Sequence, residues 1–549
     1  MLTSLLAQPG TFGSRPADPS WSSAFNLIYW YLLRYSGDRA NADKVFPSLR
    51  DYVDFMLALA KNDTTGLLRW STTGDWLEQE FPSGSSNHHV KVRDQMTSAF
   101  NTILGVKVLA DAASTLGRSA DAGKYSAVLA DQEKRFHATF YNMTAEQPVD
   151  ERCGRFVHPQ LKGCKKCANT GCCCPYAQFP GGCTFWQSKD DAAHGADGKL
   201  HMVTSCAAYP AACGAKQKPC WPDFMKGRPM HELSTKAMLG IKLSSSNFSC
   251  DLPTACTIPA AAVAAPTYGD GSQAALAYAI FLEAAPTAAL HAATVAQLVA
   301  KLKEQSVPTT GIIATKWLPE ALSGHAGAGG PRSDAVLDLV LQEQAPGWMD
   351  QISHNATTVW EVGAAAVCSW CGYASAHPPR QQNWEWMVGP FMNSHAHPAL
   401  TSIGAWLWRY LAGIRIAENA AYAGYADGYA FVTFAPYASV ATDHERVSSA
   451  SATLPTERGN VSLQWEWQAG KLRIAATLPA NSAGEVLIPK GAWSRLSEGG
   501  RTIWLRNSSG AGDGAGQVLG AEGVGGVRER AEGGLRAPIG SGRYEFLVE

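Results

Sequence analysis

The sequence predicts a mainly α-helical chain that starts with antiparallel helix pairs and finishes in an antiparallel β-sandwich. Three observations predict this fold class. Apolar residues recur at helical spacing up to about residue 140 and again from about 270 to 415. After about residue 418 they alternate with polar residues, as in strands with one buried face. Between 150 and 260 neither period is present, and Cys, Pro, Gly and Ala are abundant.

The helical part is predicted from apolar stripes that end at Gly, Pro or Asp. The first stripe runs from Trp21 to Leu33 and ends at Ser36-Gly37-Asp38, and the second runs from Val45 to Ala60. Paired helices of this kind imply a bundle, a solenoid or a closed α/α barrel, and the lack of an internal repeat disfavours a solenoid of identical units. Further helices are predicted near 92–116, 119–140, 270–284, 287–305, 331–344 and 396–414.

The stretch 150–260 is predicted to be an insertion held by disulfides, because it has too few periodic apolar residues for a core of its own. Twelve of the 14 Cys lie between Cys153 and Cys256. Their even number and concentration favour disulfides and an oxidising compartment, although Cys164-Lys-Lys-Cys167 and Cys368-Ser-Trp-Cys371 also have the spacing of zinc ligands. Glycosylation sequons strengthen the prediction of a secreted or lumenal glycoprotein, and they begin at Asn62, Asn142, Asn247, Asn355, Asn460 and Asn507.

The C-terminal part is predicted from strict alternation. Val461, Leu463 and Trp465 alternate with polar residues, and the pattern resumes at Leu472 after a turn at Ala469-Gly-Lys. Short alternating strands separated by turns indicate an antiparallel β-sandwich. Because 549 residues exceed what one core usually organises, we predict a helical domain over 1–417, interrupted by 150–260, and a sandwich domain over 418–549.

Composition and charge narrow the function classes. A net charge of −1 without a basic block makes nucleic acid a poor candidate partner, and no apolar run approaches the ~20 residues of a membrane span. Most of the 18 Trp serve packing, yet such a surplus also suits carbohydrate sites, where sugar rings stack on indoles. Secretory features without a signal peptide at the N-terminus indicate that the true beginning of the protein is missing. The sequence does not predict an oligomeric state.

Cleavage of a glycosidic bond needs two carboxyls, one to protonate the leaving oxygen and one to activate water or attack directly. One candidate is Asp75, in the loop Gly74-Asp75-Trp76, where Trp76 offers a stacking face. Glu78 and Glu80 follow close behind. The simpler interpretation is a surface turn in which Asp75 caps a backbone segment.

The second candidate is Glu361, which ends the segment Ala356-Thr-Thr-Val-Trp-Glu361. The indole of Trp360 and the preceding hydroxyls suit the wall of a catalytic site. A single Glu beside Trp is more often a surface residue, so the order of the surrounding motifs carries the assignment. His397 precedes a helical stripe and is a candidate donor to a sugar hydroxyl.

Other chemistries have no support. The sequence holds no phosphate-binding loop, no Gly-x-Ser-x-Gly elbow and no dinucleotide turn, so nucleotide enzymes and serine hydrolases are disfavoured. His88-His89 lacks a third ligand at a recognisable spacing, and His395-Ala-His397 is short for a metal site. We therefore predict no metal and no cofactor.

Taken in order, these motifs resemble the inverting α-L-rhamnosidase family of glycoside hydrolases. The likeness covers most of 18–140 and 265–415, and extends more loosely over the β-region to about 490. Each motif is weak alone, whereas five in the same order are specific. They are Asp18-Pro-Ser-Trp21, Gly74-Asp75-Trp76-Leu77, Thr309-Thr310-Gly311 with Pro346-Gly-Trp348, Ala356-Thr-Thr-Val-Trp-Glu361, and His397 with Gly404, Trp406 and Arg409-Tyr-Leu-Ala-Gly413.

The resemblance implies an (α/α)6 barrel followed by a β-sandwich, and hydrolysis of terminal, non-reducing α-L-rhamnose from a glycoside or polysaccharide without a cofactor. Glu361 falls on the family's general base. Trp30, Trp76 and His397 fall on positions that line the rhamnose pocket, and Trp360 is expected to shape its apolar wall. Asp75 is expected to hold sugar hydroxyls and is one candidate for the acid.

Two departures from the family pattern bear on activity. The Asp-Glu-Arg-x-Gly-Trp segment that carries the family's general acid is absent, and Ser23 stands where many relatives have a substrate-binding Asp. We interpret the chain as N-terminally incomplete, with some of the first barrel helices missing. The alternatives are an inactive carbohydrate-binding relative and an α/α-barrel glycosidase for another deoxy or neutral sugar.

Overall fold

The computed structural model describes thirteen stretches of the chain: 19–69, 74–75, 91–141, 266–327, 330–344, 347–353, 355–360, 396–416, 428–437, 439–506, 517–518, 521–530 and 533–549. The predicted Cys-rich insertion, Trp76 and Glu361 lie outside the described residues. Within the described part, no helix is both long and apolar enough to cross a membrane.

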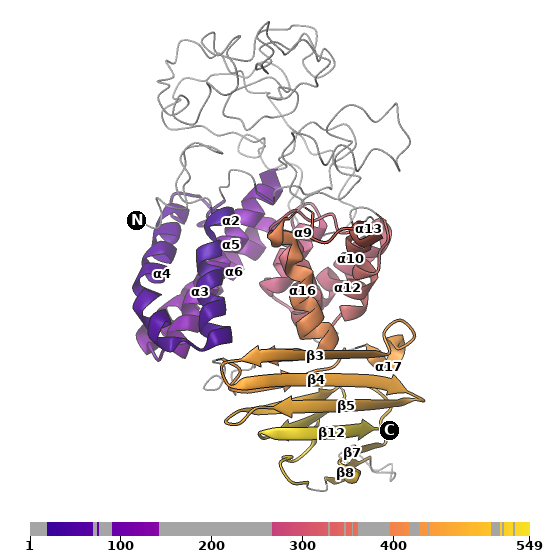
Figure 1. The fold of residues 1–549 in the computed structure, drawn as a ribbon. Helices are drawn as coiled ribbons and strands as arrows, with labels where there is room; N and C mark the ends of the chain where they lie inside the picture. The colour runs from indigo at the N-terminus through magenta and orange to yellow at the C-terminus, as the bar shows by residue number, and fades with distance from the viewer. Residues whose placement is uncertain are drawn as a thin grey trace, which may run out of the picture.

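The helices of the first half form the indigo and purple group of Figure 1. Helix α3 passes into the π-helix η1, and Gly37 then turns the chain with a left-handed φ of 68°. The Asp38 side chain accepts a hydrogen bond from Asn41 N–H and caps α4. The elements are α2 (Pro19–Ser22), α3 (Ala24–Tyr31), η1 (Leu32–Ser36), α4 (Arg39–Ala60), α5 (Lys91–Thr115) and α6 (Ser119–Phe140).

The second helical group follows residue 266 and ends at the sheets. Its bounds confirm the helices predicted near 270–284, 287–305, 331–344 and 396–414, with shorter ends. Helix α11 is an addition that the apolar pattern did not predict, because Pro319 interrupts it. The elements are α9 (Gln273–Phe281), α10 (Ala288–Gln305), α11 (Ala314–Gly324), α12 (Ser333–Val340), α13 (Trp348–Ser353), η9 (Pro398–Ser402), α16 (Ile403–Trp406) and η10 (Leu407–Ala412).

One aromatic cluster joins the two helical groups. Phe100 of α5 stacks on Tyr278 of α9, with ring centroids 4.3 Å apart, and its edge meets Trp317 of α11 at 5.4 Å. All three side chains are buried. Aromatic rings of this size bury large apolar areas, so the cluster fixes α5, α9 and α11 against one another.

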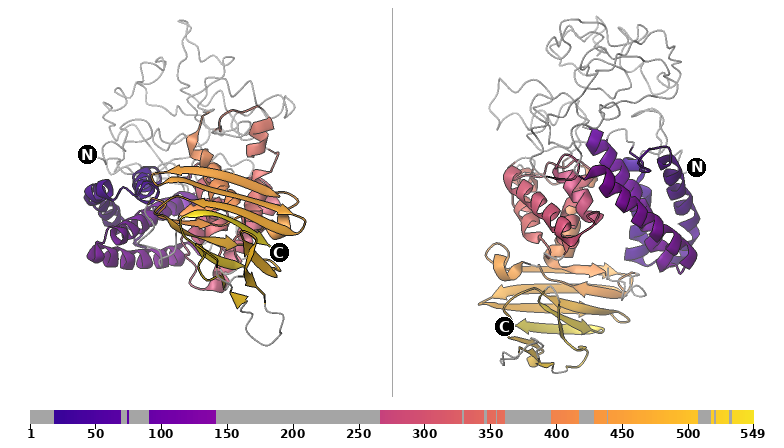
Figure 2. Two further views of the ribbon diagram at one scale, coloured as in Figure 1. Left: turned by 60° about the horizontal axis from the view of Figure 1, so that its bottom comes forward. Right: turned by 180° about the vertical axis from the view of Figure 1, so that it is seen from behind.

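The C-terminal part consists of two sheets, drawn in orange and yellow in Figures 1 and 2. The five-stranded sheet has the order β1 (Ile414–Ile416), β2 (Phe431–Phe434), β6 (Ala483–Ile488), β11 (Leu535–Ile539) and β10 (Arg528–Glu529). The seven-stranded sheet has the order β3 (Ser449–Thr456), β4 (Gly459–Gln468), β5 (Lys471–Leu478), β12 (Gly542–Val548), β7 (Arg495–Glu498), β8 (Arg501–Leu505) and β9 (Gln517–Val518).

The predicted alternation of buried and exposed residues is confirmed in β5, where Leu472, Ile474, Ala476 and Leu478 are buried. The predicted antiparallel sandwich is confirmed at the strand pairs of the described residues with one exception, because β2 and β6 run parallel. Parallel neighbours need a long crossover, and α17 (Val440–Asp443) with β3, β4 and β5 supplies it.

The end of η10 attaches the sheets to the helices. The indole N–H of Trp465 on β4 points at the carbonyls of Leu411 and Ala412 at the end of η10, at 3.1 and 3.2 Å. Gly413, with φ 100°, is the single residue between η10 and β1, and a Cβ there would collide with the Ala435 carbonyl. Only glycine fits this joint without strain.

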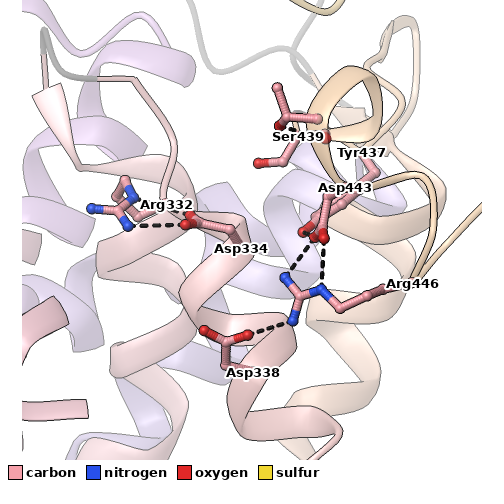
Figure 3. A network of polar contacts seen from close by, with 8 residues as sticks. Arg332, Asp334, Asp338, Tyr437, Ser439, Asp443 and Arg446 are labelled. Atoms are coloured by element: carbon pink, nitrogen blue, oxygen red, sulfur yellow. Dashed lines mark hydrogen bonds and ion pairs between the residues drawn. The ribbon is translucent and has the colours of Figure 1, made fainter. Parts of the chain in front are cut away.

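A second attachment is ionic and lies at α12 (Figure 3). The guanidinium of Arg446, just after α17, pairs with Asp443 through Nε and Nη2 at 2.6 and 2.7 Å and reaches Asp338 of α12 through Nη1. Tyr437 donates its hydroxyl to the same Asp443 carboxylate at 2.7 Å. Arg446 therefore bridges the helices and the β-region.

Candidate active site

Asp75 is a buried carboxylate that holds the start of α11. Its Oδ2 accepts a hydrogen bond from Gly311 N–H at 2.8 Å, and its Oδ1 accepts from Ile313 and Ala314 N–H at 2.8 and 3.0 Å. The Asp75 side chain is only 6% exposed. The first N–H groups of a helix have no partner within the helix, and a carboxylate there also meets the positive end of the helix dipole. Asp75 thus joins its own loop to a segment 236 residues further along the chain.

The loop before α11 is fixed from a second side. Gln273 of α9 accepts a hydrogen bond from Thr309 N–H at 3.0 Å and donates its amide to the Val307 carbonyl at 2.9 Å. The hydroxyls of Thr310 and Thr315 lie 2.8 Å apart. The predicted Thr309-Thr310-Gly311 motif is therefore a rigid turn whose polar groups are used in holding its shape.

The structure brings His397 next to the segment that leads to Glu361. The backbone N–H of His397 donates to the Val359 carbonyl at 2.8 Å. Trp360 is buried, and its N–H donates to Oε1 of Gln351 on α13 at 3.0 Å. These two hydrogen bonds fix the backbone of Val359 and Trp360, the last described residues before Glu361.

Trp30 lies on α3, next to Tyr31, whose ring contacts Lys316 of α11. Its indole is half-buried, stacks on Tyr31 with centroids 5.7 Å apart, and has the Arg34 guanidinium 5.9 Å away. Its Nε1 is buried and has no hydrogen-bond partner among the described residues. The hydroxyl of Ser23, at the position where the family often has Asp, donates to the Ser20 carbonyl.

Helix α11 is the element that these segments share. Asp75 binds its N-terminus, η9 behind His397 packs against it, and Lys316 on its first turn contacts Tyr31 beside Trp30. The sequence pattern did not single out α11 or Lys316. An apolar stripe through Ile313, Trp317 and Ala321 was the available signal, and Pro319 obscured it.

A charged cluster lies along the same helix. Glu320 accepts hydrogen bonds from Arg409 Nη1 at 2.5 Å and from the Tyr410 hydroxyl at 2.8 Å. Burial, and secondarily the charge of Arg409, lowers the pKa of Lys316 to about 8, although Glu320 acts in the opposite direction. Among the described side chains, no group of three or more His, Cys, Asp or Glu is placed to hold a metal ion.

A two-part family match covers most of the chain. The model described as the bacterial alpha-L-rhamnosidase 6 hairpin glycosidase domain matches residues 6–170 and 255–411. The model of the bacterial alpha-L-rhamnosidase C-terminal domain matches residues 423–502. The first match contains the loops of Asp75, Val359 and His397.

Relatives and solved structures point the same way. An alpha-L-rhamnosidase of Formosa agariphila is 29% identical over 194 residues, 35% of this chain and 17% of the relative. One from Streptomyces avermitilis is 28% identical over 183 residues, 33% of this chain and 14% of the relative. These matches span less than a fifth of either relative's length.

Two solved structures share the fold. The alpha-L-rhamnosidase of Dictyoglumus thermophilum has a TM-score of 0.55 at 19% identity, covering 99% of this chain and 42% of its own. The Streptomyces avermitilis enzyme, solved in complex with L-rhamnose, has a TM-score of 0.55 at 18% identity. The match covers 100% of this chain and 35% of that enzyme. At such identities the likeness shows a shared fold alone.

Proposed function

Because this chain belongs to the bacterial α-L-rhamnosidase six-hairpin glycosidase family, we propose that it hydrolyses terminal, non-reducing α-L-rhamnose from a glycoside or polysaccharide. The reaction inverts the anomeric carbon, and Glu361 acts as the general base. Its carboxylate takes a proton from water as that water attacks the anomeric carbon, while an acid protonates the leaving oxygen. Inversion requires the two carboxyls to stand roughly 6.5–9.5 Å apart, which leaves room for the water.

The observation that carries this proposal is the fixed backbone before Glu361. Trp360 is buried, its N–H is bound by Gln351, and the Val359 carbonyl is bound by His397 N–H. A catalytic carboxylate works best when its supporting residues do not move. The same hydrogen bonds bring His397, a proposed donor to a sugar hydroxyl, to the Glu361 segment.

The remaining site residues have binding and positioning roles in this proposal. Trp30, Trp76 and Trp360 form the apolar wall against which the sugar ring and its methyl group pack. Asp75 holds the Trp76 loop to α11, a role that its three hydrogen bonds from backbone N–H groups support. A carboxylate engaged in this way is better suited to positioning than to donating a proton.

We further propose that the helices belong to a closed (α/α)6 barrel, that 150–260 is a disulfide-stapled insertion between 1–149 and 261–417, and that the protein is secreted or lumenal. The three sequons within the described residues support the last point. Asn62, Asn355 and Asn460 are all exposed, as an oligosaccharide acceptor must be.

The test is the replacement Glu361→Gln, which removes the base but keeps the shape of the side chain. We expect turnover of an aryl α-L-rhamnoside to fall about 10²–10⁴-fold, the range of a general base. The matched control is Glu343→Gln, at an exposed position after α12, which should keep normal turnover. Normal turnover by Glu361→Gln would exclude it as the base.

The three backbone N–H groups bound to Asp75 make it a poor proton donor, which favours a second candidate, a carbohydrate-binding protein without turnover. Calorimetric titration of the unmodified chain with L-rhamnose separates the two functions. Binding of L-rhamnose without turnover of any of a panel of aryl glycosides would favour the binding protein. Turnover of a different aryl glycoside would identify a glycosidase for another sugar.

A further inference from the structure

Lys316 presents a half-buried ammonium between α3 and α11. Its Nζ lies 4.2 Å from the centre of the Tyr31 ring and 5.0 Å from that of Trp317. Among the described residues, Lys316 forms no hydrogen bond and no ion pair. The carboxylate nearest in sequence, Glu320, is occupied by Arg409 and the Tyr410 hydroxyl.

This placement costs stability in three ways. Burial removes water from the Lys316 ammonium, and the attraction of Glu320 offsets only part of that loss. Lys316 is the third residue of α11, so it sits at the positive end of the helix dipole. Arg409 adds a like charge nearby, so burial and then Arg409 lower the pKa of Lys316 against the opposing charge of Glu320. Lys316 keeps its half-buried charge although this placement lowers stability, and it lies close to proposed substrate-binding residues. Such a residue is a candidate for a functional role.

We propose that Lys316 binds an anionic group, a carboxylate or a sulfate, carried by the saccharide substrate. This inference rests on the proposed function, since it assigns the class of rhamnoside that the site takes. Two links connect Lys316 to that site. Asp75 binds the N–H of Ala314, the first residue of α11, and Tyr31 directly follows Trp30.

The chemistry of the surroundings suits an anion. The faces of Tyr31 and Trp317 hold the ammonium by cation–π attraction without accepting a conventional hydrogen bond, so its three N–H groups stay free to donate. A carboxylate or sulfate oxygen would form charge-assisted hydrogen bonds with them and neutralise the Lys316 ammonium, since Glu320 already pairs with Arg409. The substrate class is therefore rhamnose attached to a uronic acid, or rhamnose in a sulfated saccharide.

The binding test uses the full chain and isothermal titration with D-glucuronate, D-glucose and inorganic sulfate. We expect glucuronate or sulfate to bind more tightly than glucose, and Lys316→Met to weaken that binding about tenfold, as loss of a charged hydrogen bond implies. If only glucuronate binds more tightly than glucose, the anionic group of the substrate is a uronic acid. If only sulfate does, it is the sulfate of a sulfated sugar. The matched control is Lys303→Met, an exposed lysine of α10. Equal affinity for glucuronate, sulfate and glucose, or undiminished binding by Lys316→Met, would overturn the proposal.

A second readout separates a binding role from a structural one. Met has nearly the size of Lys without its charge, so Lys316→Met should raise the Tm. A lower Tm would mean that the ammonium serves packing and would overturn the proposal. Neither the ligand titration nor the measurement of Tm depends on turnover. Both therefore test the role of Lys316 even if the chain is inactive. If an aryl α-L-rhamnoside is not hydrolysed, only the proposed function fails.

Discussion

At the scale of single residues, the contacts of Asp75 suit a carboxylate that positions a loop. Three backbone N–H groups point at its two oxygens. Its neighbour Trp76 is a proposed wall of the sugar pocket, and we propose that the hydrogen bonds between Asp75 and the start of α11 position it.

Replacing Asp75 by Asn tests this role. One amide NH2 would then face backbone N–H donors, so we expect a loss of about 1–3 kcal/mol in the free energy of unfolding. Turnover of an aryl α-L-rhamnoside should fall mainly through a higher KM, because the Trp76 loop is displaced. Denaturant titration and steady-state kinetics measure the two effects.

The control for this replacement is Asp51→Asn, a 72%-exposed carboxylate on α4 that pairs with its neighbour Arg50. It should change neither quantity, as exposed pairs contribute little. A fall in kcat with unchanged KM and stability in Asp75→Asn would instead mark Asp75 as an acid.

The limits of sequence-based prediction are clearest at this residue. The Gly-Asp-Trp loop identified Asp75 as a candidate. The simpler interpretation, a capping residue in a surface turn, agrees with its contacts but not with its burial. Its partners were not predictable, because Gly311 lies 236 residues away and no local pattern records that contact. The roles of Glu361 and Trp76 remain predictions.

At the scale of elements, the periodicity of apolar residues was sufficient to predict a helix or strand that has one uninterrupted apolar face. The bounds of α6 and α10 agree with the predicted ranges within a residue, and β5 keeps its alternation. Periodicity failed at α11, where Pro319 breaks the pattern although the helix continues through it. The parallel pairing of β2 with β6 was also hidden, since alternation within a strand carries no information about its neighbour.

Helix α6 carries a titratable group that should shape the pH dependence of stability. Burial, with a smaller contribution from Glu283, raises the pKa of Glu133 to about 7, while Lys107 opposes the rise. Between about pH 4.5 and 7, the Glu133 carboxyl is therefore protonated in the folded state and ionised in the unfolded state. The free energy of unfolding contributed by Glu133 falls as pH rises through this window.

Glu133→Gln removes this ionisation, so its Tm should exceed that of the unmodified protein at pH 7.5 by more than at pH 5. Thermal melts at the two pH values give the difference. Glu304→Gln, on the exposed face of α10, is the control and should leave the pH dependence unchanged. An equal effect of Glu133→Gln at both pH values would contradict the expected ionisation.

At the scale of the whole molecule, specific contacts of named side chains join the helices to the β-region. Arg446 lies beyond the last helix before β3 and reaches back to α12 (Figure 3). Asp443 draws hydrogen bonds from both Arg446 and Tyr437, and its carboxylate is largely buried. Together with Trp465, this network sets the orientation of the sheets relative to the helices.

Replacing Arg446 by Met should destabilise the attachment by about 1–3 kcal/mol, because the Asp443 carboxylate keeps only the Tyr437 hydroxyl of the network drawn in Figure 3. The melting curve should separate into two steps if the helices and sheets then unfold independently. Differential scanning calorimetry gives both results. The matched control, Arg332→Met, breaks a pair with Asp334 that stays within the helical part. A change no larger than in this control would assign Arg446 no joining role.

The one-residue joint at Gly413 has a consequence for how such proteins can be recombined. Strand β1 is the edge of a sheet whose other strands all come later in the chain, yet a single glycine separates it from the π-helix η10. Transplanting the β-region between homologues at any point after Ile416 would leave that strand behind with the donor of the helices. In a viable chimera the two parent sequences must be joined before Ile414, and the position of Gly413 must remain glycine.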